Sequence, residues 1–117
     1  MVTNLKIEIE KGKEVAIINL KGLLDAHNST LFSDALKEVV NEGFLRVVVN
    51  FKNLQYLGSS GLEILLGKIQ AIRNKGGDIV LCEMSPKIYK VFDLLGLTNY
   101  FKIFKSEEET LKSFENG

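Results

Sequence analysis

The spacing of the apolar residues switches repeatedly between that of strands and that of helices, and this alternation limits the chain to a mixed α/β fold. Leu5, Ile7 and Ile9 alternate with polar residues, which predicts an edge strand with one face in water. After a Lys-Gly-Lys turn, residues 14–21 contain the run Val-Ala-Ile-Ile, which predicts a strand buried on both faces. The two strands should pair as a hairpin.

Beyond the hairpin, helical and extended patterns follow one another to the end of the chain. Apolar residues at helical spacing predict helices around residues 31–40, 62–72, 88–95 and 111–114. β-branched and apolar runs predict strands over residues 45–51, 78–83 and 100–104. Residues 52–58 should form a loop. This order favours parallel strands joined by right-handed crossovers.

The expected fold is therefore α/β, in a single domain over residues 1–117. It should have a mixed β-sheet of about five strands with an N-terminal hairpin, packed with about four helices. Two helix starts carry further signals. Ser85 before Pro86 predicts an N-cap and a first helical residue, and Ser106 with Glu109 predicts a capping box.

Composition excludes several classes of protein. The 15 basic and 15 acidic residues cancel, so the chain lacks the positive field that binds nucleic acid or anionic lipid. The first 12 residues are neither a signal peptide nor a membrane anchor, and we expect a cytoplasmic protein. His27 and Cys82 are the single residues of their types, so no metal site is expected, and Cys82 should be a buried structural thiol.

The stretch Gly58-Ser59-Ser60-Gly61 falls where a strand pattern gives way to a helical one. In one interpretation it only starts a helix: Ser60 and Glu63 form a capping box, and the glycines allow a tight turn and close packing on the sheet. A phosphate-binding loop fits poorly, because the glycine spacing differs from that motif. A catalytic serine fits poorly too, because Gly-x-Ser-x-Gly is absent and His27 is the only imidazole that could act as its base.

A further interpretation makes a serine of this stretch the substrate of a kinase. Phosphorylation adds about −1.5 to −2 charges, which the dipole at a helix N-terminus tolerates. The helix should survive, while a partner fitted to the neutral surface would have to desolvate a dianion. The sequence by itself leaves the helix-start and kinase-substrate interpretations open.

Several motifs in order over nearly the whole length resemble the STAS domain family, and most closely the small anti-sigma factor antagonists of bacteria. These motifs are Gly22-Leu23-Leu24-Asp25-Ala26, Val47 to Phe51 leading to Leu57-Gly58-Ser59-Ser60-Gly61-Leu62, Gly76 to Cys82 before Ser85-Pro86, and Val91 to Leu97. The chain departs from the family pattern at Gly58, which stands in place of the acid before the serine pair. Asn50 likewise replaces an aspartate that often ends the preceding strand.

The resemblance implies a non-catalytic partner switch without a cofactor. Unmodified, such proteins bind an anti-sigma factor that is a serine kinase; the kinase phosphorylates the second serine, and a serine phosphatase reverses this. Carried over, the phosphorylated residue is Ser60, with Ser59 as its neighbour or the helix cap. The partner surface would comprise Asp25, Gly58, Ser59, Ser60, Gly61, Leu62 and Ser85. Asp25 could equally serve only its turn. The alternative is a STAS adaptor that is not phosphorylated, in a transport or stress-signalling complex.

Overall fold

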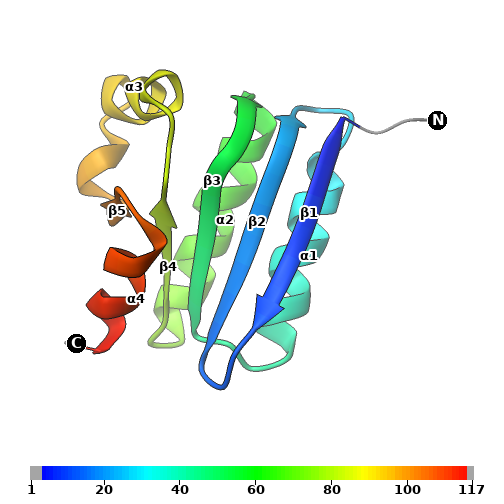
Figure 1. Cartoon of the computed structure of the whole chain (residues 1–117). Coiled ribbons are helices and arrows are strands. Elements are labelled where there is room, and N and C mark those ends of the chain that lie inside the picture. The colour runs from blue at the N-terminus through cyan, green and yellow to red at the C-terminus, as the bar shows by residue number, and fades with distance from the viewer. Residues whose placement is uncertain (1–3, 116–117) are drawn as a thin grey trace.

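A computed structural model of the protein describes residues 4–115 and contains a five-stranded sheet with the strand order β1-β2-β3-β4-β5 (Figure 1). The strands are β1 (Leu5–Lys11), β2 (Val15–Leu24), β3 (Arg46–Leu57), β4 (Asp78–Cys82) and β5 (Ile103–Phe104). The helices are α1 (Ser29–Asn41), α2 (Ser59–Asn74), α3 (Pro86–Leu94), the 3₁₀ turn η1 (Leu97–Asn99) and α4 (Glu107–Glu115). The β1–β2 pair is antiparallel and the other pairs are parallel, so the predicted mixed sheet and hairpin are confirmed.

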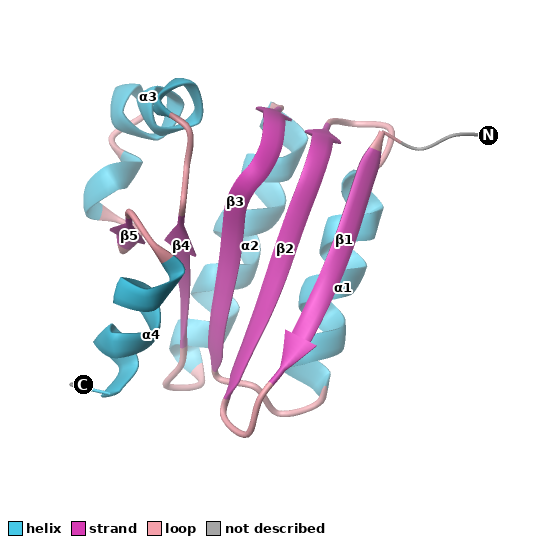
Figure 2. Ribbon diagram, viewed as in Figure 1, coloured by secondary structure: helices cyan, strands magenta, loops and turns pink. Residues whose placement is uncertain are grey.

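Helices cover the two faces of the sheet unequally. The ribbon view in Figure 2 shows α1 and α2 side by side behind the sheet, while α4 crosses in front of it near β4 and β5. The α3 helix lies at the end of the sheet where β3 and β4 finish. The front face of β1 and β2 carries no helix in this view.

The main core lies between the sheet and the pair α1 and α2. Ile18, Val49 and Leu81 are register neighbours on three adjacent strands, and all three are fully buried. At the α3 end, Phe92 contacts the ring edges of Phe51 and Phe101, with centroid distances of 6.1 and 5.9 Å. Edge-to-face ring pairs add stabilisation beyond the area they bury, and they fix α3 against the sheet.

Two predictions for the strands were wrong. β2 is not buried on both faces: its residues alternate between buried and half-buried, because α4 does not extend over this part of the sheet. Residues 52–57 are not a loop, since β3 continues to Leu57, which pairs with Leu24 of β2. The polar residues Lys52, Asn53 and Gln55 are exposed on this extension, and their solvent-facing side chains made the segment resemble a loop.

The cap signals at two helix starts are confirmed. The Ser85 hydroxyl accepts a hydrogen bond from the Ile88 N–H at 3.2 Å, and Pro86 occupies the first helical position. The Ser106 hydroxyl accepts one from the Glu109 N–H at 3.1 Å, which is the serine half of the predicted capping box. The first of these caps fixes where α3 begins beside the candidate site.

Candidate functional site

Three segments meet where β2, β3 and β4 end. They are residues 25–28 after β2, residues 58–62 at the start of α2, and residues 83–85 before α3 (Figure 1). The Gly58 N–H donates to the Leu24 carbonyl at 2.8 Å and so ties the first two segments together. In sheets with parallel strands this edge is where binding residues collect, because the loops and helix N-termini point there.

The start of α2 differs from the predicted capping box. Gly58 is the N-cap, with an extended backbone and no side-chain cap bond, and the helix begins at Ser59. Ser60 is therefore the second helical residue and too far along to cap, so the Ser60–Glu63 box was wrong. The cause is tertiary: the bond from Gly58 to Leu24 holds residue 58 in the strand direction, and the helical turn begins immediately afterwards.

Because neither serine serves as a cap, their hydroxyls are left available. Ser59 is exposed and Ser60 is half-buried. Within residues 4–115, no hydrogen bond engages the Ser60 hydroxyl, and its oxygen is not among the buried unpaired atoms. The Ser60 oxygen therefore reaches solvent. No acidic residue stands in the first turn of α2, so the N–H groups there face an uncharged surface.

Gly61 lets α2 approach the sheet at this point. A Cβ atom on residue 61 would lie 2.8 Å from Leu24 Cγ and 2.8 Å from Leu57 Cδ1. Atoms do not approach so closely without a shift, so the absence of a side chain sets the depth of the helix start. Gly61 and Leu62 were both predicted to belong to the partner surface, but both are buried. They lie beneath the serines and support them.

The segment after β2 is held by its own side chains. The Asp25 carboxylate accepts a hydrogen bond from the His27 N–H at 2.9 Å, and the Asp25 N–H donates to Asn28 Oδ1 at 3.0 Å. The Asn28 amide in turn donates to the Leu23 carbonyl at 2.9 Å. The turn-forming role of Asp25 is confirmed, and its contact with a partner stays a prediction.

The segment before α3 is fixed by a bond from a neighbouring strand. Glu83 has a left-handed backbone with φ 57, and its carboxylate accepts a hydrogen bond from Asn50 Nδ2 at 2.9 Å. Asn50 is buried, and its Oδ1 accepts from the Lys52 N–H at 2.8 Å. The Asn50 side-chain amide thus uses both its donor and its acceptor, and it fixes the segment of residues 83–85 that leads to α3.

Sequence reasoning missed Tyr56, which it left within a supposed loop. A Cβ on Gly58 would lie 3.3 Å from Tyr56 Cε2 and 3.5 Å from the Tyr56 hydroxyl, so the far edge of the ring covers Gly58. Half of Tyr56 is exposed, at 50%. The signal that could have found it is the two-residue spacing of positions 56 and 58, which places both on one side of a strand.

Burial explains why Cys82 is a structural residue, as predicted. It is fully buried at the end of β4, and burial raises the pKa of its thiol to about 12. The thiol therefore stays protonated at neutral pH and is a poor nucleophile. Among residues 4–115, no group of His, Cys, Asp and Glu has the arrangement of a metal site.

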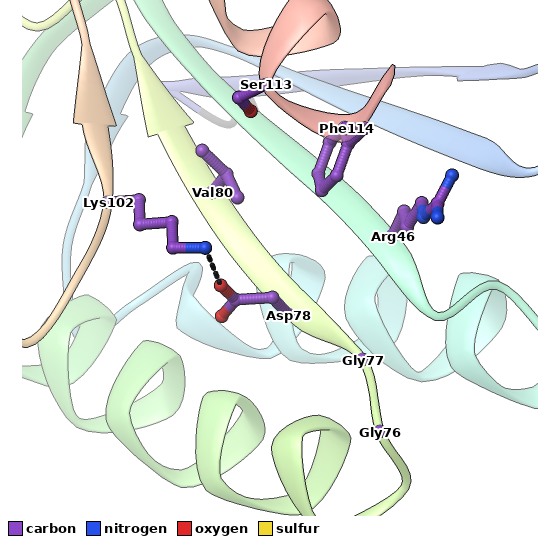
Figure 3. A pocket seen from close by; sticks show the side chains of 8 residues that line it. All are labelled: Arg46, Gly76, Gly77, Asp78, Val80, Lys102, Ser113 and Phe114. Carbon is purple, nitrogen blue, oxygen red and sulfur yellow. Dashed lines mark ion pairs between the residues drawn. The ribbon is translucent and has the colours of Figure 1, made fainter. Parts of the chain in front are cut away.

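A pocket of about 300 Å³ lies at the opposite end of the strands from the serines, and Figure 3 shows its lining side chains. Asp78 pairs there with Arg73 at 2.9 Å and with Lys102 at 3.9 Å. Arg46 pairs with Glu14 at 3.4 Å and lies over the Phe114 ring at 5.7 Å from its centroid. The charged side chains at this pocket thus form ion pairs with neighbouring residues. We therefore interpret the pocket as part of the packing between α4 and the strands.

A second pocket, of about 320 Å³, lies between α3 and β5, nearer the candidate site. Its lining consists of Met84, Pro86, Tyr89, Ile103, Phe104 and Lys105. This lining contains neither a carboxylate nor an imidazole, the groups most often used for acid and base catalysis. The pocket is lined mainly by apolar and aromatic side chains, with Lys105 as its charged residue.

Fold and site together define a small mixed-sheet α/β domain with an accessible serine pair at a helix start. A model of the STAS domain family matches residues 6–110, and the chain belongs to that family. An anti-sigma F factor antagonist of Paenibacillus polymyxa is 34% identical over 113 residues, which cover 96% of this chain and 97% of that relative.

Two solved structures support the fold. The anti-sigma factor antagonist SpoIIAA in its unphosphorylated form matches with a TM-score of 0.83 and 24% identity, over 96% of this chain and 98% of that one. The Bacillus cell fate determinant SpoIIAA in its phosphorylated form matches with a TM-score of 0.75 and 26% identity, over 93% and 99%. Within residues 4–115, no helix is long and apolar enough to cross a membrane.

Proposed function

We propose that this protein is an anti-sigma factor antagonist that works by switching partners. Unphosphorylated, it binds an anti-sigma factor that is also a serine kinase, and a sigma factor is thereby released. Phosphorylation of Ser60 ends the binding, and a serine phosphatase restores it. This function places the protein in the cytoplasm as a non-catalytic binding module, with ATP held by the kinase.

The observation that carries this proposal is the free Ser60 hydroxyl at the uncapped start of α2. A phosphate there would lie near the positive end of the helix dipole, which favours an anion by about 0.3–2 kcal/mol. The fold would therefore tolerate the modification. The naming of the Paenibacillus relative as an anti-sigma F factor antagonist supports the proposed partner class.

Release of the partner follows from desolvation. Around Ser60 the surface presents hydroxyl and aromatic groups, and the first turn of α2 holds no acid. A partner fitted to that surface would have to bury a hydrated dianion after phosphorylation, at a cost of several kcal/mol. Since about 1.4 kcal/mol corresponds to a tenfold change in affinity, one phosphate is sufficient for release.

A second candidate is an adaptor that is not phosphorylated, in a transport or stress-signalling complex. Gly58 is the observation that favours it, because residue 58 presents no carboxylate to a kinase. In an adaptor the serine pair would only form part of a constant binding surface.

Phosphate transfer separates the two candidates. The purified chain is incubated with ATP and an anti-sigma factor kinase from its own organism, the anti-sigma F factor being the first choice, and intact mass is measured. We expect one phosphate on the wild type and on Ser59→Ala, and none on Ser60→Ala. Incorporation that persists in Ser60→Ala would assign the site elsewhere, and an unmodified wild type that still binds the factor would favour the adaptor.

A further inference from the structure

Tyr56 is an exposed large side chain that the fold places against the start of α2. Its ring edge and hydroxyl lie over Gly58, at 3.3 and 3.5 Å from the point where a Cβ would stand. Gly58 itself is buried, and its N–H is tied to Leu24. The outermost group at residue 58 is thus the phenol of Tyr56 and not a side chain of residue 58.

The backbone of Tyr56 is fixed by the strand that carries it. Tyr56 belongs to β3 and pairs in register with Leu23 of β2, so its backbone lies within the sheet. Half of the side chain nevertheless remains exposed, at 50%. Within residues 4–115, no hydrogen bond engages its hydroxyl. A half-exposed aromatic ring with a free hydroxyl, carried on a paired strand, is the kind of residue that contributes most at protein interfaces.

Charge defines what can face this ring. Gly58, Ser59 and Ser60 are uncharged, and the first turn of α2 holds no acid. The neighbouring Asp25 accepts the His27 N–H with one carboxylate oxygen in its own turn, so the uncharged patch is limited to residues 58–60 and the Tyr56 ring. A partner that offered a basic pocket opposite residue 58 would leave a cation buried and unpaired, which costs several kcal/mol. The surface instead fits an uncharged apolar recess.

We propose that Tyr56 is a specificity-determining contact for the anti-sigma factor, with its ring inserted into an uncharged apolar recess of that partner beside Ser60. The inference rests on the proposed function and adds to it a residue and the chemistry of the facing surface. The inference also explains what the glycine at position 58 allows, namely contact between the Tyr56 ring and the partner. A carboxylate at residue 58 would push the ring aside and put a charge where the partner has no counter-charge.

The test measures the dissociation constant between the unphosphorylated chain and the same purified anti-sigma factor kinase by calorimetry. Tyr56→Thr removes the ring but places another residue that favours strands at this position, and we expect binding at least about tenfold weaker. Tyr56→Phe keeps the ring, and we expect a change of less than about threefold. Leu45→Ala is the matched control: Leu45 is 40% exposed and immediately precedes β3, at the opposite end of that strand from Tyr56, and binding should be unchanged.

Gly58→Asp provides a second variant that keeps the fold, since aspartate is a favourable N-cap. We expect it to bind at least about tenfold more weakly than the wild type. If the wild type binds and either Tyr56→Thr or Gly58→Asp binds as tightly, the inference is overturned and the proposed function stands. If the unphosphorylated wild type does not bind, both are overturned.

Discussion

At the scale of single residues, the depth of α2 against the sheet depends on an atom that Gly61 lacks. Leu24 and Leu57 come from the ends of two neighbouring strands, and both side chains occupy the space that a residue 61 side chain would need. The serine pair is therefore positioned by close packing beneath it. No cap bond holds it in place.

We predict that Gly61→Ala lowers the free energy of unfolding by about 1–2 kcal/mol, because overpacking outweighs the better helix propensity of alanine. Gly67→Ala in the same helix is the control. A Cβ there meets no atom within 4 Å, so this variant should gain about 0.5–1 kcal/mol. Urea unfolding measures both, and equal effects of the two substitutions would contradict the packing argument.

Asn50 is the second residue whose chemistry is specific, since it donates to Glu83 at 2.9 Å and accepts from the Lys52 N–H at 2.8 Å. Asn50→Asp replaces the donor by an acceptor and sets two carboxylates face to face. We predict a loss of about 1–3 kcal/mol in unfolding free energy at pH 7. Adding Glu83→Gln supplies a donor from the other side, so the double variant should recover most of the loss in the same chemical denaturation assay. A double variant less stable than Asn50→Asp would rule out the pairing.

At the scale of elements, the start of α4 contains a carboxyl group in an unfavourable place. Glu107 Oε1 is buried without a hydrogen-bond partner among the described residues. Burial, and then the nearby charges of Glu10 and Glu83, raise the pKa of Glu107, while Lys52 opposes this. A raised pKa means that the folded state holds the proton more tightly than the unfolded state does. Stability from this group is therefore present at low pH and is lost as pH rises through the raised pKa.

We predict that Glu107→Gln raises the unfolding free energy at pH 7 by a few tenths to about 1 kcal/mol, a small value because the side chain is only partly buried and solvent screens the rest of it. The difference from wild type should vanish below pH 4.5, the ordinary pKa of a glutamate side chain. Glu108→Gln is the control, since Glu108 is exposed and pairs with Lys112 at 3.4 Å. It should lose about 0.2–0.5 kcal/mol at pH 7. Thermal unfolding from pH 4 to pH 8 tests the direction of this pH dependence. If Glu107→Gln were still more stable than the wild type at pH 4, the raised pKa of Glu107 would not be the cause.

At the scale of the whole molecule, the proposed switch should change the surface and leave the fold as it is. Ser60 lies in the first turn of α2, where an anion is favoured, and the sheet beneath it is fixed by Gly61, Leu24 and Leu57. We predict that Ser60→Glu changes unfolding free energy by no more than about 1 kcal/mol, with a gain as the expected direction.

Asn74→Glu is the control for the dipole, because Asn74 ends the same helix and an anion is disfavoured there. The Asn74→Glu variant should have an unfolding free energy lower than that of the wild type by about a few tenths of a kcal/mol. Amide chemical shifts in Ser60→Glu should change only near residues 24–28 and 56–64. Shift changes that spread to α4 would show a conformational switch instead of a surface one.

Much of the fold could be predicted because the responsible signals are local. The period of the apolar residues gave the hairpin and the order of elements, and Ser85-Pro86 gave the start of α3. Predictions failed where long-range pairing overrides local composition. The segment of residues 52–55, in which three of the four residues are polar, forms a strand because β2 pairs alongside it. Ser60 is not a cap because Leu24 holds Gly58 in the strand direction.

By itself the sequence determined the α/β class, the hairpin, the family and the serine pair at a helix start, because periodicity and motif order are properties of neighbouring residues. Only the tertiary structure decided that Ser60 has a free hydroxyl, that Tyr56 covers Gly58, and that Asn50 holds Glu83. Each of these depends on atoms that are distant in the chain or displaced by packing, and their distances follow from how the strands pair.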